Sequence, residues 1–104
     1  MYANLTEYRF RYDQGEQSEV SIQRLMGTTE REAMPIAAGQ AGFRAYHFVR
    51  VAPDVVLSIS LWDDEAACER GLATMLAWAR ENTAPYLAAP PVRQAGEVIL
   101  AYPG

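Results

Sequence analysis

Few side chains of this 104-residue chain combine a reactive type with a position suited to chemistry. The segment from Gly42 to Glu65 is the most informative, because two runs rich in Val, Ile, Phe and Tyr flank Pro53-Asp54 and the second run ends at Trp62. A Pro-Asp pair favours a reversing turn, so the segment predicts a β-hairpin. A bulky indole at a strand end can wall a cleft and stack on an aromatic ligand. Trp62 is therefore the first candidate for a site residue, with packing at the end of the sheet as the alternative.

His47, on the first run of this hairpin, is the only imidazole available as a general base near neutral pH. It shares strand parity with Phe43 and Val49, so a buried or interface histidine is the alternative interpretation. Tyr46 points to the opposite face, and both side chains cannot line one cleft if the strand is regular. Arg44 shares the face of Tyr46 and is a candidate for binding an anionic substrate, although a solvated ion pair is the simpler interpretation.

Composition and charge exclude several classes of partner. The net charge is −4 and Lys and Arg form no cluster, so we expect no nucleic-acid partner, because such binding depends on neutralising phosphates. The apolar stretches are shorter than the ~20 residues of a membrane-spanning helix, and the N-terminus lacks the features of a signal peptide. We therefore expect a cytoplasmic protein with no membrane association.

Cysteine usage argues against a structural metal or a disulfide. Cys68 is the only cysteine, and with the single His47 it cannot form a cysteine-rich zinc site. Its helical spacing with Leu72, Met75 and Ala79 favours a buried core thiol over a nucleophile. No Gly-rich phosphate loop, nucleophile elbow or paired His and carboxylate motif is present, so we expect no metal site.

The periodicities predict one domain that spans residues 1–104. They indicate a strand at 2–12, a helix that Ser18 caps and Pro35 kinks or restarts before it ends at 39–42, the hairpin, a helix at 64–82 and a strand at 92–102. The order strand, helix, strand, strand, helix, strand predicts an α+β fold. It is the ferredoxin-like βαββαβ arrangement, an antiparallel sheet with two helices on one face.

Both faces of the predicted hairpin carry large side chains, although the helices can cover only one of them. Val49 and Val51 point opposite to Tyr46 and Phe48, and the second strand alternates in the same way. A sheet with a second, partly apolar face implies a partner, most simply another copy packed sheet to sheet. We expect a homodimer.

The Gly42-Phe43 pair, the run Leu61-Trp62-Asp63-Asp64-Glu65-Ala66-Ala67 and the closing Gly96-Glu97-Val98 resemble the antibiotic biosynthesis monooxygenase family of dimeric α/β barrels. The resemblance covers nearly the whole chain. It implies a dimeric α/β barrel and includes among its activities the cofactor-independent oxidation of aromatic polyketides. The family also contains haem-degrading enzymes, isomerase-like members and proteins of unknown activity, so the fold does not fix the function.

For the polyketide-oxidising members the resemblance implies a site built on the strands. Trp62 matches a tryptophan that ends the third strand, Ser58 stands where those members have an asparagine, and Asn4 is the nearest first-strand asparagine. In this interpretation Trp62 orients the rings, Asn4 and Ser58 bond substrate or peroxide oxygens, and His47 is the base. Asn4 as a solvated strand residue and Ser58 as a hydroxyl within the sheet are the alternatives.

Tyr8 or Tyr46 would position the substrate, a small aromatic or polycyclic phenol, and no cofactor is expected, since neither flavin nor metal is needed for an electron-rich anion to react with oxygen. The competing hypothesis is a non-catalytic protein of the same fold that binds a small apolar ligand or serves in assembly. Haem degradation is a third and weaker interpretation. That branch uses a His and a Trp inside the second helix, where this chain has no His and a displaced Trp78.

Overall fold

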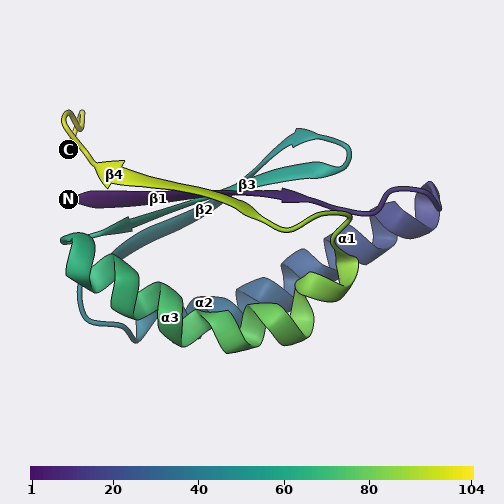
Figure 1. Ribbon diagram of the computed structural model, residues 1–104, viewed down its shortest axis with the longest axis horizontal. Coiled ribbons are helices and arrows are strands. Elements are labelled where there is room, and N and C mark those ends of the chain that lie inside the picture. Colours follow the sequence, from purple (N-terminus) through teal and green to yellow (C-terminus); the bar gives the residue numbers. More distant parts are fainter.

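A computed structural model describes residues 1–104 as a four-stranded antiparallel sheet with helices against one face (Figure 1). The strand order is β2-β3-β1-β4. This arrangement is the ferredoxin-like α+β fold that the sequence predicts. In chain order the elements are β1 Tyr2–Arg9, α1 Glu16–Thr28, η1 Thr29–Ala33, α2 Met34–Ala38, β2 Phe43–Ala52, β3 Val55–Trp62, α3 Glu65–Asn82, η2 Ala84–Tyr86 and β4 Val92–Glu97.

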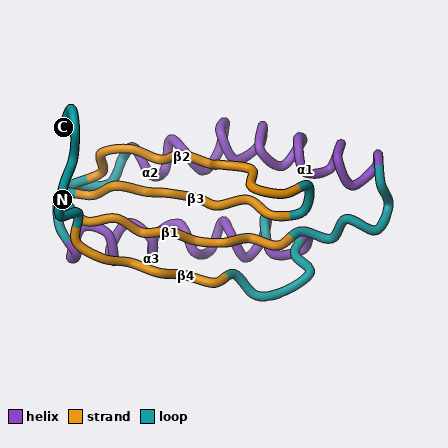
Figure 2. Tube along the Cα trace, turned by 90° about the horizontal axis from the view of Figure 1, so that it is seen from above, coloured by secondary structure: helices purple, strands orange, loops and turns teal.

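The two long helices lie side by side under different strands of the sheet (Figure 2). The continuous helix formed by α1, η1 and α2 runs beneath the β2 edge of the sheet, and α3 runs beneath β1. No helix of the structure is long and apolar enough to span a membrane.

The first long helix differs from its prediction at its start. It begins at Glu16 after Gly15, whose φ of 54° lies in the region that favours glycine. Ser18 is already inside the helix, where its Oγ accepts a hydrogen bond from the backbone N–H of Gln14 at 3.1 Å. The predicted Ser18 cap is therefore wrong by one turn, because a glycine with positive φ turned the chain earlier.

The restart expected at Pro35 is confirmed. Five residues, Thr29–Ala33, form a π-helical segment, and Pro35 then lies in the first turn of α2. Proline has no N–H to donate and fits best where a helix begins, so the wider π turn separates two regular helices. The consequence for the site is that Thr29 and Ala33 both point into the interior, where each is buried.

The second helix begins as predicted. The Asp64 Oδ1 atom accepts a hydrogen bond from the Ala67 N–H at 2.8 Å and caps α3. Gly42, with φ of 82°, lies against this turn, and a Cβ there would be 2.6 Å from the Cβ of Ala67. The junction between β3 and α3 is therefore closely packed.

The last strand is shorter than predicted, ending at Glu97 instead of Tyr102. Glu97 pairs with Tyr2, the first residue of β1, and beyond this pair Val98 N–H donates to Met1 O at 2.9 Å. Ile99, Leu100 and Tyr102 are left with more than four-fifths of their surface exposed. The apolar run at 98–102 thus extends past the last paired residue of β4.

The two faces of the sheet differ in character. Rows across β1, β3 and β2 on the covered face are Asn4-Ser60-Tyr46 and Thr6-Ser58-Phe48, and rows on the open face are Leu5-Ile59-His47 and Glu7-Leu57-Val49. A bulge between Phe43 and Ala45 turns Phe43 to the covered face, where its ring meets Trp62 edge to face at 5.4 Å. The prediction that Phe43 shares the face of His47 is therefore wrong.

Candidate functional site

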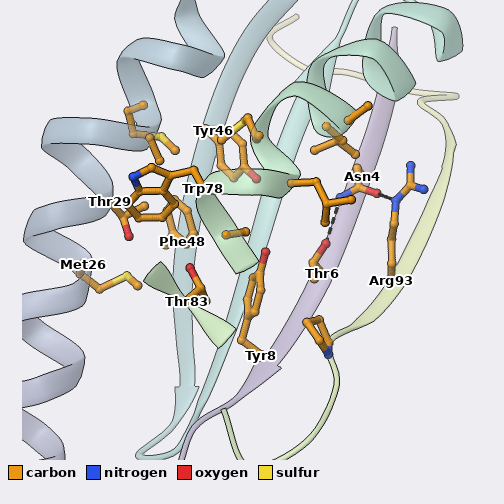
Figure 3. A pocket seen from close by; sticks show the side chains of 18 of the residues that line it. Asn4, Thr6, Tyr8, Met26, Thr29, Tyr46, Phe48, Trp78, Thr83 and Arg93 are labelled. Carbon is orange, nitrogen blue, oxygen red and sulfur yellow. Dashed lines mark hydrogen bonds between the residues drawn. The ribbon is translucent and has the colours of Figure 1, made fainter. Parts of the chain in front are cut away.

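A cavity of about 430 Å³ lies between the covered face of the sheet and the helices. Most of the residues that line it are apolar, and they come from β1, β2, the first long helix and α3 (Figure 3). Phe48 and Trp78 supply flat aromatic surface at one end. A volume of this size and an apolar lining are typical of small-molecule sites.

A group of linked polar side chains lies at the other end of the cavity (Figure 3). The Asn4 Nδ2 atom donates to Thr6 Oγ1 at 3.0 Å, and Arg93 Nε donates to Asn4 Oδ1. Asn4 and Thr6 are buried. The Asn4 carbonyl oxygen and one of its two N–H groups are thus engaged, which leaves the other amide N–H, the Thr6 hydroxyl hydrogen and one Nη1 hydrogen of Arg93 as the donors at this end.

Arg93 joins this group to the opposite layer. Its Nη2 atom donates to Glu69 Oε1 on α3, and the two side chains are about half exposed. Glu69 and Arg93 are the charged residues among those that line the cavity. One end of an otherwise apolar space therefore carries a compensated ion pair that reaches solvent.

Tyr8 and Tyr46 lie between the two ends of the cavity (Figure 3). Burial raises the pKa of both phenol groups, and the nearby Ser58 hydroxyl opposes both shifts. The two tyrosines therefore stay protonated near neutral pH. Each can donate or accept a hydrogen bond, but neither is a base.

Ser58 lies behind these tyrosines and does not line the cavity. It is fully buried, and although its Oγ atom lies near both phenol groups, it makes no hydrogen bond of standard geometry. A buried hydroxyl without a partner costs stability.

The aromatic end of the cavity is held by a contact between helices. Trp78 Nε1 donates to Glu32 Oε1 at 3.1 Å, which links α3 to η1. This bond fixes the indole plane beside Phe48 and Met26 (Figure 3). The helices are thus tied together at the place where a ring would stack.

The structure places Trp62 away from this cavity. The side chain is fully buried at the end of β3, and its Nε1 atom donates to Ser60 Oγ at 3.0 Å. It rests on Gly71, where a Cβ would come within 2.2 Å of the indole ring. Trp62 therefore packs the corner of the sheet against α3 and leaves no space for a ligand beside it.

His47 and Arg44 are also remote from the cavity. His47 is exposed on the open face, in the row of Leu5 and Ile59. Arg44 lies at the bulge, where its Nε atom donates to Asp63 Oδ1 at 2.7 Å, and about half of each side chain is exposed. Neither residue lines the cavity. The catalytic role expected for His47 and the binding role expected for Arg44 stay predictions.

The fold therefore brings together three of the residues singled out from the sequence, Asn4, Tyr8 and Tyr46. Four others, Trp62, Ser58, His47 and Arg44, do not line the cavity.

The polar and charged cavity residues Thr6, Glu69 and Arg93, together with Trp78, were not among the site residues predicted from the sequence. Two of them carried a signal in the sequence. Thr6 shares strand parity with Asn4, and Arg93 is the only basic residue of β4.

Other candidates for chemistry give no second site. No group of three or more His, Cys, Asp and Glu side chains is arranged to hold a metal ion. Cys68 is fully buried in the core, as its helical spacing predicts, and burial raises the pKa of its thiol. A protonated, inaccessible thiol is a poor nucleophile.

No family model and no curated protein matches the chain in sequence. Solved structures do match its fold. A protein of unknown function from Nitrosomonas europaea, NE2512, is 19% identical with a TM-score of 0.76, covering 96% of this chain and 90% of its own. SnoaB, a cofactor-independent oxygenase from Streptomyces nogalater, is 17% identical with a TM-score of 0.69, covering 99% and 97%.

A monooxygenase from the gene ActVA-Orf6 of Streptomyces coelicolor, solved with the ligand nanaomycin D, is 14% identical with a TM-score of 0.67 and covers 96% of this chain and 92% of its own. The resemblance predicted from the sequence is thus confirmed in the fold. At these identities the likeness carries the architecture and no residue roles.

Proposed function

We propose that this chain is a cofactor-independent monooxygenase that oxidises a small aromatic or polycyclic phenol in the cavity of the covered face. The observation that carries the proposal is the linked group of Asn4, Thr6 and Arg93 at one end of an apolar, aromatic-walled space. The fold shared with cofactor-independent oxygenases supports the reaction class.

The cavity suits a planar ring with an oxygen substituent at the polar end. The ring would lie against Phe48 and Trp78, whose faces offer stacking surface. The phenolic oxygen would then approach Arg93 and the free hydroxyl hydrogen of Thr6. Tyr8 and Tyr46, protonated near neutral pH, would bond a second oxygen of the substrate between these ends.

The chemistry requires an electron-rich anion that reacts directly with oxygen. A deprotonated phenol gives electrons to O₂, a carbon–oxygen bond forms at a ring carbon, and the resulting hydroperoxide loses water to leave a quinone. One oxygen atom of O₂ enters the product and the other leaves in water, while the substrate supplies both electrons and both hydrogens. The protein must stabilise the phenolate and the peroxide.

Arg93 and Glu69 are suited to the proton step. The guanidinium favours the ionised form of a phenol beside it, and the Glu69 carboxylate is the acceptor within reach of the same end of the cavity. When Glu69 takes the proton, Arg93 exchanges one anionic partner for another, the phenolate. The net charge of the group does not change, which limits the cost in a partly buried place.

Oxygen uptake with 1-naphthol and anthrone tests this proposal. We expect uptake with formation of the quinone, and a loss of roughly a hundredfold in kcat/KM in Arg93→Gln, as for the removal of one charged donor at a developing anion. Arg80→Gln, at an exposed position of α3 away from the cavity, is the matched control and should keep wild-type activity. Equal uptake in both variants would remove Arg93 from the mechanism.

A non-catalytic binding function is the second candidate, and the Asn4 amide favours it. Its carbonyl oxygen and one of its two N–H groups bond within the protein, so only one amide N–H is left to hold a peroxide. A binding protein would show phenol-dependent thermal stabilisation, about 2.7 kcal/mol at a hundredfold excess over the dissociation constant, with no oxygen uptake.

We also propose that the chain acts as a homodimer joined through the open face. Leu5, Val49, Val51 and Val92 on that face keep 40%, 43%, 54% and 59% of their surface exposed. Scattered apolar residues are ordinary on a surface, but a contiguous sheet face with no helix over it marks an interface. A second copy would cover it.

A further inference from the structure

A second cavity, of about 450 Å³, lies between α1 and the β2 edge of the sheet. Its inner wall is apolar and is formed by Ile22, Met26, Phe48 and Val56. Its outer rim is polar, with Gln23 and Glu30 from the helix side and Arg50 from β2. The space therefore runs from the interior of the protein toward solvent at the β2 edge.

The two cavities share one wall. Five residues line both of them: Met26, Thr29, Met34, Tyr46 and Phe48. Several of these surround the aromatic end of the main cavity (Figure 3). No rigid element separates the two spaces, because the boundary consists of side chains, two of which are flexible methionines.

The π-helical segment lies at this boundary. Thr29 begins the segment, lines both cavities and donates from its Oγ to Leu25 O at 2.7 Å. Glu30 of the same segment lines only the second cavity, and Glu32 holds Trp78 of the main cavity. Segments of this kind occur often at functional sites, because the extra residue per turn redirects neighbouring side chains.

We propose that the second cavity binds a linear apolar side chain of the ligand whose phenolic ring occupies the main cavity. The inference rests on the function proposed for the main cavity and narrows its substrate class to phenols with an alkyl chain. The chain leaves the ring at the aromatic end, passes Met26 and Met34, and lies along Ile22 and Val56 beneath the β2 edge.

The residues that line the second cavity favour an alkyl chain on the ligand. Burying methylene groups against apolar walls is favourable, and the unbranched thioethers of the methionines adapt to a flexible alkyl chain better than to a rigid ring. The one cation at the rim, Arg50, is already paired with Glu19 through two bonds of 2.6 and 2.7 Å. A negatively charged end group on the ligand would therefore find no free cation there.

The test uses the series 4-ethylphenol, 4-butylphenol, 4-hexylphenol and 4-octylphenol, with dissociation constants from calorimetric titration. In the wild type we expect affinity to rise by roughly two- to fourfold for each added methylene, as for transfer into an apolar space. Gln23→Trp places an indole at the rim of the second cavity, and this dependence should then flatten. Arg24→Trp, at an exposed neighbour that lines neither cavity, is the matched control and should keep it.

A flat series in the wild type, or an unchanged dependence in both Gln23→Trp and Glu30→Trp, would overturn the inference. Oxygen uptake on the same compounds separates it from the proposed function. Oxygen uptake without any effect of alkyl-chain length would contradict the role of the second cavity and support the oxygenase function. Binding that strengthens with alkyl-chain length but consumes no oxygen would support the role of the second cavity and contradict the oxygenase function.

Discussion

The two faces of the sheet invert the usual distribution of polar and apolar residues. The covered face buries Asn4, Thr6, Ser58 and Ser60 at its centre, whereas the open face presents Leu5 and other aliphatic side chains. A sheet that only had to stabilise a monomer would place these residues the other way round. The difference supports the two proposals made above, a site on the covered face and a second copy against the open face.

The open face gives the largest expected effect. Val49→Asp places a carboxylate in the middle of this face, and its burial without a partner should raise the dimer dissociation constant by more than about a hundredfold. Val20→Asp, at an equally exposed valine on α1, is the control and should leave association unchanged. Sedimentation equilibrium measures both. A wild type that is monomeric at micromolar concentration would contradict the proposed interface.

The packed corner of the covered face is the next test. Gly71→Ala drives a methyl group into the Trp62 ring and should lower the free energy of unfolding by about 2–3 kcal/mol. In Gly27→Ala the new methyl group meets only the flexible end of Arg31 at 3.1 Å, so this helical change should stabilise by about 0.5–1 kcal/mol. Urea unfolding compares the pair, and equal values would mean that Trp62 is not packed as described.

Two serines on β3 sharpen the comparison within the covered face. Ser60→Ala leaves the Trp62 N–H without its acceptor and should cost about 1 kcal/mol. Ser58→Ala removes a hydroxyl that has no partner, so the free energy of unfolding should stay level or rise by up to about 1 kcal/mol. Chemical denaturation of the two variants measures the difference. A larger loss for Ser58→Ala would show that its hydroxyl is satisfied.

The smallest effect concerns the ion pair at the β2 edge. Hydrogen bonds from Arg50, then from Gln23 and Tyr12, lower the pKa of Glu19 from 4.5 to about 2. The pKa of Glu19 is thus lower in the folded than in the unfolded state, so its ionised form stabilises the fold above the unfolded pKa. This contribution to the free energy of unfolding is lost as pH falls from about 4.5 to about 2.

Glu19→Gln should remove this part of the acid dependence of Tm. Glu30→Gln, an exposed glutamate on the same side of the first long helix, is the control and should retain it. Thermal melts across this pH range measure both variants. Identical acid profiles for Glu19→Gln and the wild type would show that the bridge does not form in solution.

The sequence was sufficient for the order of the elements, because alternation and helical spacing are local properties of the chain. It was not sufficient for the face of Phe43, since the bulge before Ala45 depends on pairing with β3. The residue at which β4 ends was likewise not determined by the local sequence. The pattern continues to Tyr102, but pairing stops at Glu97 where β1 begins.

The site was predicted only in part, for a related reason. Asn4, Tyr8 and Tyr46 share one face by strand parity, and that face proved to be the covered one. Arg93 and Trp78 reach the same space from elements far away in sequence, because β4 pairs with β1 and α3 packs against the sheet. Residue type favoured Trp62, yet the absence of a side chain at Gly71 decided its burial.

The indole N–H signals of the two tryptophans provide the most direct test of whether the covered face holds the site. One of these residues, Trp78, lines the cavity, whereas Trp62 packs outside it. In a ¹H–¹⁵N correlation spectrum assigned with Trp78→Phe, titration with 4-butylphenol should shift the Trp78 indole signal and leave that of Trp62 in place. Shifts confined to Trp62, or to backbone amides of the open-face residues His47 and Val49, would contradict the account.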